Sequence, residues 1–209
     1  MIARSVAVAT IGLLLFQVAA CSEPRAGSRA TSSGTPPLEV RAVDGFSVYR
    51  GRGFAFAYPT GWTAFHGRGR FIDDPVVEFA GPETAGRLPP LIDLFREEGF
   101  EGDIKTYVRN FNIGHGTTLP ARSVVRDEPA SMQGALGARI IETRFDAAPL
   151  LDGAGRPDSP MVVRQIDLLV VAPGGVTIDL RTTAPARDFE SLARTFETVI
   201  DSLAVGDGA

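Results

Sequence analysis

The sequence predicts an α+β domain in which helices cover an antiparallel β-sheet. Two observations carry this prediction. Apolar and polar residues alternate on both sides of a Pro-Gly-Gly turn at 173–175, which is the pattern of two paired strands with one buried face. Residues 188–203 then carry an apolar stripe with helical period. A sheet with one apolar face and a helix with one apolar stripe bury each other, so together they favour a layered domain.

Further strands are predicted along the chain before this hairpin. Phe54–Tyr58 alternates large and small apolar residues, and Pro59-Thr60-Gly61 ends it, so we expect 62–65 to return as its antiparallel partner. The remaining strand-like segments are 76–80, 91–95, 122–125 and 138–145.

Two helices are predicted by apolar spacing. In 103–112, apolar residues recur at i, i+3, i+4 and i+7, Asp103 is placed to cap the start, and Gly114 is placed to end the helix. In 188–203, Asp188 is the expected N-cap. The expected apolar stripe of this second helix consists of Phe189, Leu192, Phe196, Val199, Ile200 and Leu203.

The N-terminus has the pattern of a bacterial secretion signal. Arg4 provides a positive charge, an apolar stretch runs from Val6 to Phe16, and small residues precede Cys21. The stretch is shorter than the roughly 20 apolar residues that a spanning helix needs, which disfavours a retained membrane helix. A plain signal peptide that happens to precede a cysteine is the other alternative.

The segment Val18-Ala19-Ala20-Cys21 resembles the bacterial lipobox. The resemblance implies a diacylglyceryl group on the Cys21 sulfur and cleavage after Ala20. Cys21 is the only cysteine, so the chain forms no internal disulfide. We therefore expect a signal peptide at 1–20, a lipidated flexible tether at 21–44, one globular domain at 45–205 and a disordered tail at 206–209.

The order of elements resembles that of the PsbP-like/Mog1-like family, an α/β/α sandwich. The residues that carry this resemblance are Phe54, Phe56, Tyr58, Pro59, Gly61, Trp62 and the helix 189–203. Within the family, the chain is most similar to actinobacterial LpqN/LpqT-type lipoproteins. The resemblance implies a non-enzymatic role in the envelope, supplies no catalytic residues, and leaves the topology of 147–160 open.

Residues with the spacing of a catalytic or metal site are not evident. His66 and His115 each lie beside glycine and are expected to be exposed loop residues, and neither carboxylate pair, Asp73–Asp74 or Glu97–Glu98, faces one way on a strand. The segment 152–158 lacks the alternating ligands of a calcium loop. We therefore expect no enzyme activity, no metal and no cofactor.

Four arginines form a candidate binding site for an anion or a partner. If 54–58 and 62–65 form a hairpin, Arg50 and Arg52 come opposite Arg68 and Arg70, which suits a lipid headgroup or an acidic polymer. Ordinary solvated arginines are the competing interpretation. The formal net charge of −4 argues against a nucleic-acid partner.

The sequence thus favours a lipoprotein anchored through Cys21 to the outer face of the cell membrane, where it binds or scaffolds an unidentified envelope protein, lipid or acidic polymer. An alternative is a carrier of a small apolar or lipid ligand, which requires a cavity larger than about 300 Å³ between sheet and helices. An enzyme is a third alternative, and requires a pocket of convergent ionisable groups with shifted pKa values.

Overall fold

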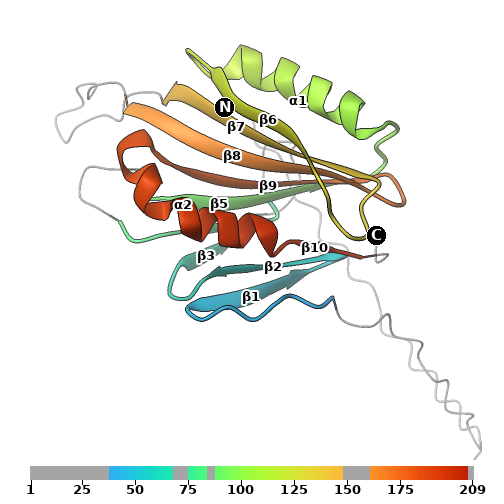
Figure 1. Cartoon of the computed structure of the whole chain (residues 1–209), viewed down its shortest axis with the longest axis horizontal. Coiled ribbons are helices and arrows are strands. Elements are labelled where there is room, and N and C mark those ends of the chain that lie inside the picture. Colours follow the sequence, from blue (N-terminus) through green and yellow to red (C-terminus); the bar gives the residue numbers. More distant parts are fainter. Residues whose placement is uncertain (1–37, 68–74, 84–87, 148–160, 207–209) are drawn as a thin grey trace, which may run out of the picture. The chain divides into compact units, whose positions relative to one another are not determined.

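The computed structural model describes residues 38–67, 75–83, 88–147 and 161–206, all within one compact unit, Thr35–Ala209. These residues form ten strands and two helices (Figure 1). In chain order they are β1 (Phe46–Gly51), β2 (Phe54–Pro59), β3 (Thr63–His66), β4 (Val77–Ala80), β5 (Leu91–Glu97), α1 (Ile104–Thr118), β6 (Ser123–Ala130), β7 (Gly137–Ala147), β8 (Met161–Ala172), β9 (Val176–Pro185), α2 (Ala186–Asp201) and β10 (Ala204–Val205).

The strands form two sheets whose paired neighbours are all antiparallel. The larger sheet has seven strands in the order β3-β4-β5-β9-β8-β7-β6, and the smaller has three in the order β1-β2-β10. The predicted hairpin is confirmed as β8 and β9, with Gly174 and Gly175 both at positive φ in the turn between them. Glycine adopts these angles without a steric penalty, so Pro173-Gly-Gly175 suits the turn.

The predicted partner of the Phe54 strand is wrong. β2 pairs with β1 across a tight turn at 51–53. After β2 the chain leaves the small sheet, and β3 pairs with β4 at the edge of the large sheet. Pro59-Thr60-Gly61 is therefore a crossing between two sheets and not a hairpin turn. Local alternation identifies a strand, but its partner depends on which neighbouring turn brings the chain back.

Both predicted helices exist, with different ends. Asp103 caps α1 as expected, since its carboxylate accepts a hydrogen bond of 2.8 Å from the Thr106 backbone nitrogen. Gly114 does not end α1, which continues to Thr118. At α2 the N-cap is Pro185, so Asp188 lies inside the first turn, where a carboxylate favourably meets the positive end of the helix dipole.

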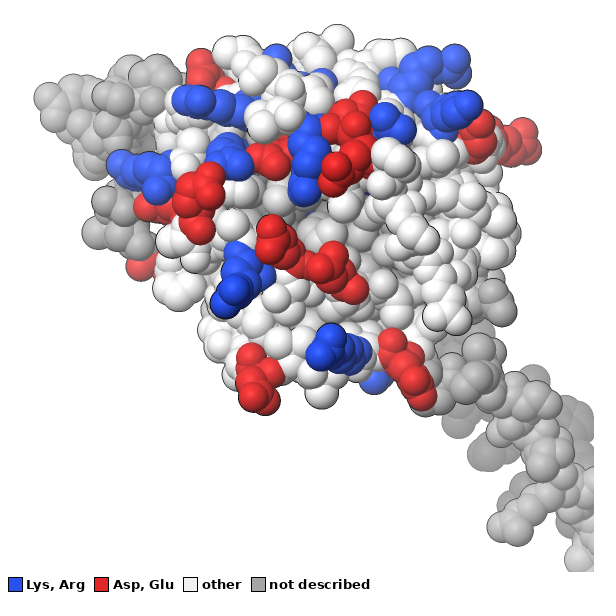
Figure 2. Space-filling model, viewed as in Figure 1, with Lys and Arg blue, Asp and Glu red and all other residues white. Residues whose placement is uncertain are grey.

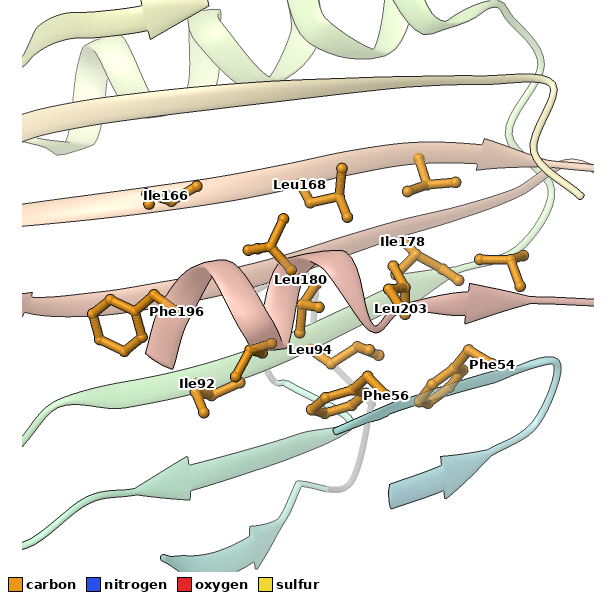
Figure 3. Packing of buried hydrophobic residues seen from close by; sticks show 14 of the residues in the cluster. Phe54, Phe56, Ile92, Leu94, Ile166, Leu168, Ile178, Leu180, Phe196 and Leu203 are labelled. Atoms are coloured by element: carbon orange, nitrogen blue, oxygen red, sulfur yellow. The ribbon is translucent and has the colours of Figure 1, made fainter. Parts of the chain in front are cut away.

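The main core lies between the two sheets, with α2 contacting both of them (Figures 1 and 3). Figure 3 shows Phe54 and Phe56 of β2 facing aliphatic side chains of β5, β8 and β9, with Phe196 of α2 at the other end of the same cluster. The predicted stripe is confirmed: Phe189, Phe196, Val199, Ile200 and Leu203 are buried and Leu192 packs against them. The predicted α+β class, with helices on an antiparallel sheet, is confirmed.

Several predictions fall on parts of the chain that the structure does not describe. These are the signal and Cys21, the tether up to residue 37, Arg68 and Arg70, the loop 148–160 and the tail from residue 207. Across the described ranges, neither helix is long and apolar enough to cross a membrane.

Candidate functional site

A row of charged residues crosses the middle of the large sheet. Strand pairing places Glu78 of β4 opposite Asp93 of β5, Asp93 opposite Arg181 of β9, and Arg181 opposite Asp167 of β8. Residues directly opposite one another project from the same face of a sheet. This face is the one that α1 packs against, whereas the adjacent Leu168 and Leu180 enter the main core.

The expectation that the central hairpin has only one buried face is wrong. Asp167 is fully buried, and Gln165, Thr177 and Asp179 are each at most 5% exposed. Helix α1 lies over β7 and β8 on this side of the sheet (Figure 1), so the polar side chains of β8 are shielded from water. Buried charges are costly unless they are paired, so their contacts determine what this face can do.

Arg181 is the centre of the charged row. Its Nε donates to Asp167 Oδ1 over 2.7 Å, its Nη2 donates to Asp179 Oδ2 over 2.7 Å, and its guanidinium lies 4.5 Å from the centre of the Phe95 ring. Burial opposes the charge on Arg181, but the Asp179 and Asp167 carboxylates outweigh burial and raise its pKa. Arg181 therefore stays cationic and holds the two carboxyl groups together.

The carboxyl groups around Arg181 differ in how well they are satisfied. Gln165 donates to both oxygens of Asp167, over 2.9 and 2.8 Å. Asp179 Oδ1 has no donor group among the described residues, and neither does Asp93 Oδ1. Each acid lies beside another carboxyl group, Asp167 for Asp179 and Glu78 for Asp93. The structure thus places more buried carboxyl oxygens here than the neighbouring donors satisfy.

Burial and mutual repulsion raise the pKa values of these poorly satisfied carboxyl groups. Burial raises the pKa of Asp93 to about 7, with Glu78 and Asp167 adding to the shift and Arg181 opposing it. Burial likewise raises the pKa of Asp179 well above its usual range, against the attraction of Arg181 and with the help of Asp167. Asp179 therefore tends to keep its proton at neutral pH, whereas Asp93 titrates near neutrality.

The prediction that His115 is an exposed loop residue is wrong. His115 lies in α1, half-buried, with its Nδ1 3.1 Å from the Phe111 carbonyl oxygen and its Nε2 3.1 Å from Arg181 Nη2. Since the carbonyl only accepts and the guanidinium only donates, Nδ1 carries the hydrogen and Nε2 accepts. Burial, followed by the charge of Arg181, lowers the pKa of His115 and keeps the ring neutral.

His66 is exposed as expected, but it lies in strand β3 and not in a loop. Its ring lies 6.0 Å from the ring of Tyr49. Within the described ranges, no three histidine, cysteine or acidic side chains are grouped so that they could hold a metal ion.

A cavity of about 550 Å³ opens beside α1, over strands β5 and β9, and we refer to it as the α1 cavity. It exists because α1 packs over β7 and β8, where Phe111 meets Ile141 and Leu169, and leaves β5 and β9 uncovered. Its described lining consists of Phe95, Glu97, Phe100, Tyr107, Asn110, Phe111, Gly114, His115, Thr118, Leu119, Asp179 and Arg181.

The α1 cavity has aromatic walls and an ionic base. Phe100 and Tyr107 lie with ring centres 5.5 Å apart, and Phe111 stacks on His115 at 4.0 Å. Burial raises the pKa of Tyr107, so its hydroxyl is neutral. Asp179 and Arg181 form the base, which belongs to β9. The arrangement can hold an apolar body against the rings and a polar group against the carboxyl.

Sequence reasoning missed this site, although the sequence contained a signal for it. Asp167, Asp179 and Arg181 project from one face of two neighbouring predicted strands. Opposite charges on one face suggest a network of ion pairs, and that network is buried if a helix packs on the same face. The predicted apolar face of α1, including Tyr107 and Phe111, needs such a sheet face to pack on.

The predicted arginine site is only half within the described residues. Arg50 donates to the Leu38 carbonyl oxygen, and Arg52 forms an exposed ion pair of 3.3 Å with Glu98. The hairpin that would bring Arg68 and Arg70 opposite them does not form, so the geometric reason for the cluster is lost. The four-arginine site stays a prediction, as does lipid attachment at Cys21.

Charges of both signs share the visible surface. Figure 2 shows Lys and Arg intermingled with Asp and Glu over the described part of the face it views, without an extended region of one sign. An interspersed surface of this kind gives little long-range attraction for a polyanion.

Comparisons with known proteins identify the fold. No family model matches the sequence and no curated protein matches it. Among solved structures, cyanobacterial PsbP (CyanoP) from Synechocystis sp. PCC 6803 superimposes with a TM-score of 0.55 at 14% identity, over 78% of this chain and 94% of that one. LpqN of Mycobacterium tuberculosis does so with a TM-score of 0.50 at 14% identity, over 78% and 86%.

The Ran-binding protein Mog1p of Saccharomyces cerevisiae also matches, at a TM-score of 0.47 and 12% identity over 78% of this chain and 96% of that one. At such identities the likeness concerns the fold alone. The described domain therefore has the α+β fold of cyanobacterial PsbP and of LpqN.

Proposed function

We propose that this protein is a lipid-anchored, non-enzymatic module of the cell envelope that binds a small ligand in the α1 cavity. The observation that carries the proposal is the cavity itself. Its volume of about 550 Å³ lies within the range of roughly 300–1,000 Å³ that is usual for ligand sites. Aromatic walls with a few convergent polar groups are also the usual lining of such sites.

The envelope location rests on the N-terminal sequence and on one structural neighbour. Val18-Ala19-Ala20-Cys21 has the pattern of a lipobox, and a two-chain lipid anchor holds a domain stably at a bilayer. LpqN, which shares the fold, is described as involved in cell envelope biogenesis. Both observations favour a role at the outer face of the cell membrane.

The cavity also bears on the alternative of an apolar or lipid carrier. It has the required position, between a helix and the sheet, and the required volume. Its base, however, contains Asp179 and Arg181, and covering such groups with hydrocarbon leaves an acceptor without a partner. The lining therefore suits a ligand with both an apolar body and a polar group.

The enzyme alternative receives some support, because the cavity contains ionisable groups with shifted pKa values. We favour binding because His115, the candidate general base, already has both of its ring nitrogens hydrogen-bonded. The hydroxyl of Thr118, in the same lining, is also engaged, since it donates to the Gly114 carbonyl oxygen over 3.1 Å. A general base needs a free lone pair facing its substrate.

Two glycines of α1 provide a matched test of the cavity. Gly114 lines the cavity and Gly116 does not, and a Cβ placed on either meets no atom within 4 Å. A Gly114→Phe side chain can therefore enter the cavity, whereas Gly116→Phe leaves it open. Binding of 4-phenylbutanol to the full chain in lipid nanodiscs is measured by calorimetry, with empty nanodiscs as the blank.

We expect Gly114→Phe to abolish saturable binding of 4-phenylbutanol and Gly116→Phe to preserve the affinity of the unmodified chain. Equal binding by both variants would show that the probe sits elsewhere. Absence of saturable binding to the unmodified chain would remove the α1 cavity as a ligand site.

The anchor has its own test. Mass spectrometry of the mature protein from its native host should find an N-terminal Cys21 with the added mass of a diacylglyceryl group. The Cys21→Ser variant should lack this mass and should not be released by cleavage after Ala20. An unmodified Cys21 in the native protein would refute the envelope anchor while leaving the cavity proposal standing.

A further inference from the structure

We propose that the ligand of the α1 cavity is a protonated amine carried on an apolar body. This inference rests on the proposed function, because it names the chemical class that the same cavity takes. It depends on three features of the described lining: an excess of carboxyl groups, one buried carboxyl oxygen without a donor group, and aromatic walls.

Carboxyl groups outnumber the cations around Arg181, and of the three aspartates beside it Asp179 lines the cavity. Asp93, Asp167 and Asp179 all act on the single guanidinium of Arg181. Glu97 adds an exposed carboxylate to the lining, at the end of β5. Because Asp179 tends to hold a proton in the empty cavity, a positive ligand can take the place of that proton beside the carboxylate.

The other ionisable groups near the cavity do not reverse this balance. His115 is neutral because it lies between a carbonyl oxygen and a guanidinium. Arg122 is absent from the described lining; its guanidinium lies 5.9 Å from the centre of the Phe111 ring and donates to Asn112 over 2.7 Å. Glu78, next in the charged row beyond Asp93, is a further acid.

Asp179 supplies the specific contact. It lines the cavity and is only 5% exposed; its Oδ2 accepts from Arg181, while its Oδ1 has no donor group among the described residues and the carboxyl lies beside that of Asp167. An ammonium group is a compact donor of up to three hydrogen bonds, and a charge-assisted bond to a carboxylate is among the strongest in proteins. On binding, Asp179 releases the proton that it tends to hold in the empty cavity, and the ligand ammonium donates to the resulting carboxylate.

The aromatic walls suit the remainder of such a ligand. Phe100 and Tyr107 form one pair of neighbouring rings, Phe111 and His115 form another, and all four residues line the cavity. Rings bury the apolar body, and their faces attract a nearby cation. Phe95 already serves Arg181 in this way, at 4.5 Å.

An anionic ligand fits the same lining poorly. Arg181 contributes the only guanidinium of the described lining, and its Nε and Nη2 are already bonded to Asp167 and Asp179. An incoming carboxylate would have to share the Arg181 guanidinium with the carboxylate of Asp167, which lies 2.7 Å from the Nε atom. Like charges at such distances in a buried site cost affinity.

Three probes with one skeleton separate the possibilities: 4-phenylbutylammonium, 4-phenylbutanol and 4-phenylbutyrate. Calorimetry uses the full chain in lipid nanodiscs, and the Gly114→Phe variant provides the blank for partition into the lipid. We expect the ammonium to bind at least tenfold more tightly than the alcohol, and the carboxylate to bind more weakly than both. Asp179→Asn should remove the advantage of the ammonium and preserve binding of the alcohol.

Glu142→Gln is the matched control. Glu142 is also a buried carboxylate paired with an arginine, Arg164, but it lies on the opposite face of the sheet. This variant should keep the full preference for the ammonium. Retained alcohol binding by Asp179→Asn also demonstrates that the variant is folded.

The outcomes distinguish this inference from the proposed function. If the alcohol or the carboxylate binds as tightly as the ammonium, and Gly114→Phe blocks it, the cavity is a ligand site and the amine class is wrong. If Asp179→Asn keeps the tenfold preference, Asp179 is not the recognition group and the inference is overturned. If none of the three probes binds saturably, the proposed function fails with it.

Discussion

Replacing Asp93 by asparagine should remove a large part of the pH dependence of stability. Asp93 is buried in the charged row of the large sheet, and its pKa is about 7 in the folded protein against an ordinary value of 3.8. Between these two values the folded state holds a proton that the unfolded chain has released. Wild-type stability therefore falls as pH rises through this window, because the carboxyl must finally ionise in a buried site.

The size of the effect follows from the two pKa values. A difference of about three units corresponds to about 4 kcal/mol, fully present below pH 3.8 and lost once pH has passed about 7. Asparagine cannot ionise, so Asp93→Asn lacks this loss. The difference in unfolding free energy between variant and wild type should therefore shift by about 4 kcal/mol in favour of the variant from pH 4 to pH 8.

His115 acts in the opposite direction on absolute stability. Its pKa is lowered by burial, so its contribution is present above its ordinary value of 6.5 and is lost as pH falls. Because wild type and variant both contain His115, this contribution cancels in the difference between them. The difference, and not either curve alone, is the quantity to compare with the structure.

Urea unfolding followed by the fluorescence of the single tryptophan, Trp62, measures both free energies at each pH. Glu142→Gln removes a buried carboxylate from the other face of the sheet and should retain the wild-type loss of stability between pH 4 and pH 8. A difference between Asp93→Asn and wild type that stays constant from pH 4 to pH 8 would refute the assigned environment of Asp93.

Three further substitutions test the fold. Phe196→Ala empties a fully buried site between α2 and both sheets and should lower the free energy of unfolding by about 3–5 kcal/mol in urea titration; a loss below about 1 kcal/mol would contradict the packing. Gly114 lies inside α1, and a Cβ placed on it meets open space, so Gly114→Ala should raise the free energy of unfolding by up to about 1 kcal/mol. A decrease would show that the helix ends there. Gly175→Ala should lower the melting temperature, since φ is +72° and the new Cβ would lie 2.9 Å from the Phe100 carbonyl oxygen; an unchanged value would contradict this turn geometry.

The sequence was sufficient to predict most strands and the inward face of each helix. Alternation located the strands of the β8–β9 hairpin, and helical spacing identified Phe111 and Phe196 as core residues. These patterns are local, because a side chain's direction depends only on its position within its own element. Asp103 was likewise predictable as an N-cap, since a cap contacts the next turn of the same helix.

Strand partners and helix ends were less predictable, because they depend on distant parts of the chain. The Phe54 strand has a plausible turn on either side, and only the packing of two sheets selects the one at 51–53. Gly114 remains helical although glycine often ends helices: α1 continues for one more turn, and there Thr117 and Thr118 donate to the Gly114 carbonyl oxygen.

The candidate site was missed because its members are unremarkable in sequence. Asp179 and Arg181 belong to an alternating strand whose polar face is expected to meet water. Only the placement of α1 on that face turns them into the base of a cavity and brings His115 against Arg181. The one available hint was the excess of acids over arginine on this face of the predicted hairpin.

The charged row across the large sheet also penalises incorrect threading of its strands. If β8 slid past β9 by one residue, Asp167 would exchange faces with Leu168 and enter the hydrocarbon between the two sheets. An unpaired carboxylate there costs several kcal/mol, and Arg181 would lose its partner at the same time. The side chains that we assign to ligand recognition therefore also exclude misaligned forms of the sheet during folding, so mutations chosen to alter binding must be checked for strand alignment as well.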